Sequence, residues 1–139
     1  MIQRIQSIWL LAAALCAALT YKFPFYSGNK IGESNMPQFE KLVAPSSFFL
    51  VISTAILVAG CLLVIFFYKN RKQQLWLSIT AACLSIINLI IYFGEIKKFI
   101  SGTFSLTAIL AFAIPVFLFL AARGIRKDEK LVKSLDRLR

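Results

Sequence analysis

Residues 48–68 read FFLVISTAILVAGCLLVIFFY, a run with no charged residue, no proline and a single glycine. As an α-helix rising ~1.5 Å per residue, this run is ~30 Å long, which matches the hydrocarbon core of a bilayer. The basic residues Lys69, Arg71 and Lys72 follow it closely. Because an excess of Lys and Arg marks the cytoplasmic side, the pattern predicts a membrane helix that ends in the cytoplasm.

Three further apolar runs accompany this helix, and we expect four spans at residues 5–21, 48–68, 75–93 and 103–122, with a tail at 123–139. The predicted fold is all-α, a four-helix transmembrane bundle forming one integral membrane domain of residues 1–139. With both termini cytoplasmic, the cytoplasmic segments hold eleven of the 16 basic residues and the outer segments five. This bias predicts a multi-pass membrane protein with both termini on the cytoplasmic side.

The first apolar run also has features of a signal peptide, because Arg4 precedes an apolar region rich in small residues. A lipoprotein signal needs a small residue before its cysteine, whereas Leu15 precedes Cys16. We interpret the run as a retained first span with Arg4 on the cytoplasmic side.

The longest loop, residues 22–46, then faces outward. Glycines and prolines interrupt it, and Ser27, Gly28 and Asn29 are suited to a tight turn. Two interpretations remain open: a short hairpin that turns at these residues, or an irregular cap resting on the helices.

The residue types exclude several classes of activity. The chain has no histidine, and its six acidic residues all lie in loops or the tail. Histidine-based catalysis, imidazole zinc sites and proton relays within the spans are therefore excluded. Cys16, Cys61 and Cys83 lie singly in apolar runs, where packing explains them. We expect no enzyme activity, no catalytic residue, no metal site and no cofactor.

Contacts between the spans are expected from two kinds of residue. Asn88 is the most polar residue within the spans, and we expect it to hydrogen-bond across helices rather than bind a substrate. Small residues four apart let helix backbones approach each other. Four pairs have this spacing: Ala13 and Ala17, Ala14 and Ala18, Ala55 and Ala59, and Ser78 and Ala82.

The tail, RGIRKDEKLVKSLDRLR at residues 123–139, predicts an amphipathic basic helix that either extends the fourth span or hinges at Gly124. Its apolar side holds Ile125, Leu131, Val132, Leu135 and Leu138. Its basic side holds Arg126, Lys130, Lys133 and Arg137, which with Lys69, Arg71 and Lys72 form a candidate contact for a partner or for lipid. Three interpretations stay open: a solvated tail packed under its own bundle, binding to anionic lipid, or docking to an acidic cytoplasmic partner such as RNA or a ribosome.

Both ends of the chain resemble an uncharacterised family of small four-span membrane proteins from Bacteroidota, a domain of unknown function. The similar stretches are MIQRIQS at residues 1–7 and IRKDEKLVKSLDRLR at residues 125–139. The hydropathy layout between them is also similar. The resemblance implies an inner-membrane location in a Gram-negative cell, and it carries no catalytic residues.

These observations predict a non-enzymatic accessory or assembly subunit of a larger inner-membrane complex, for example one for protein translocation or envelope biogenesis. Its expected partners are membrane lipids and other membrane subunits. The alternative is a small carrier or lipid-binding protein with a pocket between the spans, near Asn88 and Pro115.

Overall fold

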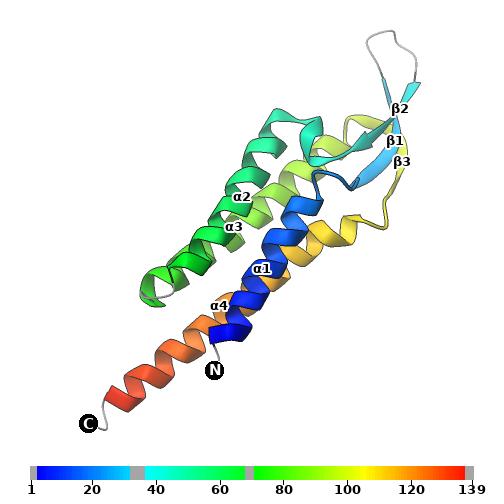
Figure 1. Ribbon diagram of the computed structural model, residues 1–139. Coiled ribbons are helices and arrows are strands. Elements are labelled where there is room, and N and C mark those ends of the chain that lie inside the picture. Colours follow the sequence, from blue (N-terminus) through cyan, green and yellow to red (C-terminus); the bar gives the residue numbers. More distant parts are fainter. Residues whose placement is uncertain (1–2, 32–36, 68–70, 137–139) are drawn as a thin grey trace.

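The computed structural model describes residues 3–31, 37–67 and 71–136. Four helices and a small sheet follow one another along the chain (Figure 1). The elements are α1 (Gln3–Leu19), β1 (Tyr26–Ile31), β2 (Pro37–Leu42), the 3-10 helix η1 (Ala44–Ser46), α2 (Phe48–Phe66), α3 (Arg71–Ile96), β3 (Phe99–Phe104) and α4 (Ala108–Asp136).

Each helix packs against two others: α1 and α3 each contact both α2 and α4. Three helices are long and apolar enough to cross a membrane, namely Phe48–Phe66, Lys72–Ile96 and Ala108–Val132. The apolar part of α1, Ile5–Leu19, is shorter. The sheet lies at one end of the helices, and α4 projects beyond the others at the opposite end (Figure 1).

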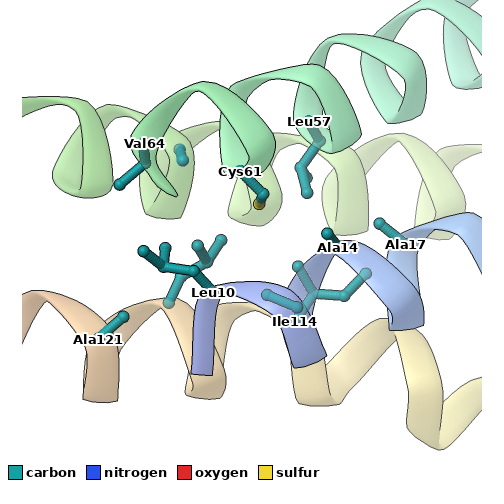
Figure 2. Close-up of a cluster of buried hydrophobic side chains, with 11 residues drawn as sticks. Leu10, Ala14, Ala17, Leu57, Cys61, Val64, Ile114 and Ala121 are labelled. Atoms are coloured by element: carbon teal, nitrogen blue, oxygen red, sulfur yellow. The ribbon is translucent and has the colours of Figure 1, made fainter. Parts of the chain in front are cut away.

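Small and aliphatic side chains fill the centre between the helices. Figure 2 shows Leu10 and Ala17 of α1 pointing toward Leu57 and Cys61 of α2, and all four are fully buried. The other alanine of the Ala13–Ala17 pair is buried too. Ala18 is exposed, and so are both members of the predicted pair Ala55 and Ala59, so this spacing marks a packed face at Ala13 and Ala17 but not in α2.

The outer faces of the helices are apolar as well. Ile8, Ile56, Ile90 and Phe119 each expose more than half of their surface. A helix that is hydrophobic on all sides needs an apolar medium, so these faces fit a bilayer.

The expectation of a mostly helical fold with four helices is confirmed. The fold is not all-α, however, because three strands form an antiparallel sheet in the order β2-β1-β3. Strand β1 pairs with β2 from Tyr26↔Leu42 to Ile31↔Pro37. The hairpin interpretation of the outer loop is therefore right, but its predicted turn is wrong. Gly28 lies within β1, and the connection between the two strands falls at residues 32–36, outside the described residues.

Two glycines explain how β1 and β3 approach each other. Gly28 and Gly102 face each other across the two strands. A Cβ at Gly28 would lie 2.2 Å from the backbone oxygen of Ser101 and 2.7 Å from the Cα of Gly102. Only glycine fits such close backbone contact, so these two residues determine where the strands pair.

Aromatic packing joins the sheet to the helices. The Phe25 ring stacks against the Tyr92 ring of α3 with centroids 4.6 Å apart, and both side chains are buried. The Tyr21 hydroxyl donates to the backbone oxygen of Val51 in α2 at 2.9 Å. The outer segment is thus an ordered cap on the helices.

The predicted helix bounds need correction at three helices. The first helix ends at Leu19 rather than at residue 21. The fourth helix begins at Ala108 rather than at Thr103, since Thr103 and Phe104 belong to β3. The tail after residue 122 extends the fourth helix and does not hinge at Gly124, because α4 runs unbroken through Pro115 and Gly124 to Asp136. The third helix is also longer than predicted, from Arg71 to Ile96.

Candidate functional site

One stripe of α4 faces the other helices. Ile114, Leu118 and Ile125 are buried at helical spacing, and Asp128 continues the stripe with 7% of its surface exposed. The Gln6 side chain of α1 donates from Nε2 to the Asp128 Oδ2 at 2.7 Å. Burial strengthens this bond and makes an unpaired partner costly, so the pair fixes the start of α1 against α4.

The Gln6 side chain also packs closely against α4 at Gly124. A Cβ at Gly124 would lie only 3.0 Å from the Gln6 Cγ. A larger residue at this point of α4 would push the Gln6 side chain away from Asp128. Gly124 therefore makes room for the Gln6 side chain of α1, and it is not a hinge.

Past Asp128, the apolar side of α4 is no longer covered. Leu131 is 45% exposed and Val132 is 37% exposed, whereas Ile125 is 1% exposed. The helices of this chain therefore bury the stripe at Ile125 but leave it open two turns later. Of the predicted apolar side, Leu138 lies outside the described residues, and the side chain of Leu135 is not described.

Three of the residues predicted as a contact surface have described side chains, and they belong to the start of α3 and the last turns of α4, which lie at the same end of the molecule (Figure 1). On α4, Arg126 and Lys130 are exposed, and so are Arg123 and Lys127. On α3, Lys72 is exposed. The other four predicted residues are not placed: Lys69 and Arg137 lie outside the described residues, and the side chains of Arg71 and Lys133 are not described.

We call Arg126, Lys130, Leu131 and Val132 the projecting surface of α4. Within about two turns of one helix, it carries cationic groups on one side and uncovered apolar groups on the other. Neither kind of group alone is unusual on a protein surface. Together they suit contact with a partner that is both acidic and apolar.

An apolar crevice of about 330 Å³ lies between α3 and α4. Leu75, Ile79 and Ile86 line it from α3, and Arg123 and Arg126 line it from α4. A second, more open groove of about 480 Å³ lies beside Lys72 and Trp76. Neither is lined by Asn88 or Pro115, where the carrier hypothesis expects a pocket.

Asn88 lies between α2 and α3 and is almost fully buried. Its Nδ2 donates to the Thr54 Oγ1 of α2 at 3.1 Å. Its Oδ1 has no hydrogen-bond partner among the described residues. The amide thus bridges two helices with one of its two polar atoms.

The described residues hold no group of three or more His, Cys, Asp or Glu side chains that could bind a metal ion. The described cysteines Cys16, Cys61 and Cys83 are free thiols. Arg126 offers positive charge in the crevice that the Cys83 thiol also lines. Positive charge beside apolar surface can bind an anionic or acidic partner.

Three features of this region were missed from the sequence. Gln6 lies within the predicted first span and Asp128 within the predicted tail, and neither is among the predicted contact residues, although each continues a buried stripe at a spacing of three or four residues. Extending the helical pattern past the apolar residues would have found both. Arg123 was overlooked because its role depends on the distance between α3 and α4, which no local pattern contains.

Comparison with known proteins gives one match. No curated protein and no solved structure matches the chain. The family model described as Domain of unknown function (DUF4293) matches residues 2–138. The resemblance to an uncharacterised family is confirmed at this level, whereas the Bacteroidota origin and the four spans stay predictions. Since the match covers nearly the whole sequence, the chain belongs to the DUF4293 family.

Proposed function

We propose that this protein is a non-enzymatic accessory or assembly subunit of a larger complex in the bacterial inner membrane. It docks its partner with the projecting surface of α4. Complexes for protein translocation or envelope biogenesis fit this role. The observation that carries the proposal is the exposure of Leu131 and Val132 on a helix that extends past its own neighbours.

The partner is a protein that offers acidic and apolar groups together. RNA phosphates would satisfy Arg126 and Lys130 but would leave the Leu131 and Val132 side chains uncovered. A groove that encloses the end of α4, with one acidic wall and one apolar wall, matches both kinds of group. Charge steers such an encounter, and apolar burial supplies most of the affinity.

The orientation follows from the distribution of charge. The end with Arg123, Arg126 and Lys130 is the cytoplasmic end, so both termini lie in the cytoplasm and the sheet faces outward. In this proposal the shorter apolar helix Ile5–Leu19 of α1 also crosses the membrane, which brings the number of spans to four. At ~22 Å it is shorter than the bilayer core, and local thinning of the bilayer accommodates it.

The test is a pull-down of the tagged full chain from its own membranes in a mild detergent. We compare the unmodified chain with Lys130→Glu and with the double variant Leu131→Ser, Val132→Ser. A stoichiometric partner is expected with the unmodified chain. Each variant should reduce its recovery about tenfold or more, which corresponds to the loss of ~1.4 kcal/mol at a central contact.

Matched controls carry the same changes at the sheet end. Leu106 is 92% exposed, so Leu106→Ser removes an apolar group that packs on nothing in this chain. Lys97 is exposed on the turn after α3, so Lys97→Glu reverses one charge far from α4. Both controls should retain the partner. Recovery of only a monomer or self-oligomer, while other membrane complexes survive the same conditions, would refute the proposal, and so would capture that ribonuclease abolishes.

A further inference from the structure

The crevice between α3 and α4 has an apolar wall and a cationic end. Leu75, Ile79 and Ile86 line it along α3, a length of ~16 Å at ~1.5 Å per residue. Phe119 of α4 lies at the same crevice. Its volume of about 330 Å³ falls at the lower end of the range of ligand pockets.

The two arginines stand where a bilayer surface would cross α4. From Ala108 to Ala122 the helix has no charged residue, and Arg123 is the first charge on it. Arg126 follows one turn later and lines the same crevice. The apolar wall therefore extends from this boundary toward the middle of the membrane, and the guanidinium groups mark the headgroup level.

The residues that line the crevice carry only positive charge. Arg123 and Arg126 belong to this lining, and it contains no acidic residue. An occupant with an anionic group would meet two cations and no repulsion.

From this geometry we infer that the crevice binds one anionic phospholipid. The phosphate lies against Arg123 and Arg126, which can each offer parallel N–H donors to its oxygens. One acyl chain lies along the wall between Leu75 and Ile86. A zwitterionic lipid would fill the same wall but would place its own cation at the arginines, so the site prefers anionic headgroups.

The experiment titrates the purified full chain in mild detergent with phosphatidylglycerol or phosphatidylcholine and counts bound lipids by native mass spectrometry. We expect one phosphatidylglycerol to bind about tenfold or more tightly than phosphatidylcholine. Cys83 provides a second readout, since this exposed thiol lines the crevice. Phosphatidylglycerol should slow its alkylation by a maleimide.

Two variants separate the headgroup contact from the acyl-chain contact. The double variant Arg123→Gln, Arg126→Gln should abolish the preference between the lipids. Cys83→Trp should weaken binding of both, because the indole fills the crevice without changing the charge. Lys22→Gln with Lys97→Gln is the matched control: both lysines are exposed at the sheet end, and their loss removes the same charge.

Three outcomes would overturn the inference: equal binding of the two lipids to the unmodified chain, unchanged preference in the double arginine variant, or alkylation of Cys83 that phosphatidylglycerol does not slow. Equal binding of the two lipids would mean that the protein contacts lipid without selecting a headgroup. The Cys83 readout uses the unmodified chain, so a variant that fails to fold does not decide the result. Arg126 belongs to both this site and the projecting surface of α4, so the two proposals are distinguished at the residues that they do not share. Lys130→Glu should leave lipid binding intact, and Arg123→Gln should leave partner capture intact.

Discussion

Replacing Gly28 with alanine would place a methyl group against the backbone of β3. The added Cβ would lie 2.2 Å from the Ser101 oxygen and 2.7 Å from the Gly102 Cα. These atoms belong to the backbone and cannot rotate away, so β1 and β3 must separate. Overpacking of this kind costs about 1–3 kcal/mol.

Hydrogen exchange of the strand amides measures that cost directly, because the amides of a weakened sheet open more often. A loss of 1–3 kcal/mol should speed exchange in β1 and β3 about 5- to 150-fold. Gly94→Ala is the matched control. A Cβ at Gly94 meets nothing within 4 Å, and alanine is a better helix former by about 0.5–1 kcal/mol.

The control should therefore slow or preserve exchange in α3 and leave the sheet unchanged. If Gly28→Ala exchanges at the rate of the unmodified chain, the two glycines do not face each other. The register of the sheet derived above would then be wrong.

Substitutions at Thr54 and Gln6 and labelling of Cys61 test contacts between the helices. Thr54→Val removes the hydroxyl that Asn88 contacts and should cost about 1–3 kcal/mol of unfolding free energy in detergent. Adding Asn88→Leu to that variant should restore part of the lost stability. Gln6→Leu removes the donor to buried Asp128 and should lower the unfolding midpoint, with faster exchange at the start of α1. Cys61 is fully buried, so a maleimide should label it only when the helices unfold, and rapid labelling of the folded protein would contradict the packing of α2.

The helices were predictable from the sequence because their determinants are local. The length of the apolar run at 48–68 and the basic residues after it indicate where the helix begins and ends, and α2 occupies Phe48–Phe66. The sheet was not predictable in the same way. Gly28 and Gly102 are far apart in the chain, and each has the sequence surroundings of an ordinary loop glycine. Only the folded structure shows that they pair. Strand pairing of this kind depends on tertiary structure.

In the candidate site, too, the residues set by local sequence were predictable, and those set by tertiary packing were not. The basic and apolar sides of the tail follow from helical periodicity, so Arg126, Lys130 and Leu131 could be singled out. The sequence did not show that α1 covers α4 only as far as Asp128, which leaves Leu131 exposed. The contribution of Arg123 to the crevice likewise depends on how α3 packs against α4.

Photo-crosslinking in living cells tests the docking of α4 most directly. A photoreactive amino acid at Leu131 should yield one discrete adduct with another protein, because this side chain is exposed on the projecting surface. The same group at Leu106, exposed at the sheet end, should not yield that adduct. If Leu131 crosslinks only to lipid or to a second copy of this chain, the protein does not act as a docking subunit through α4.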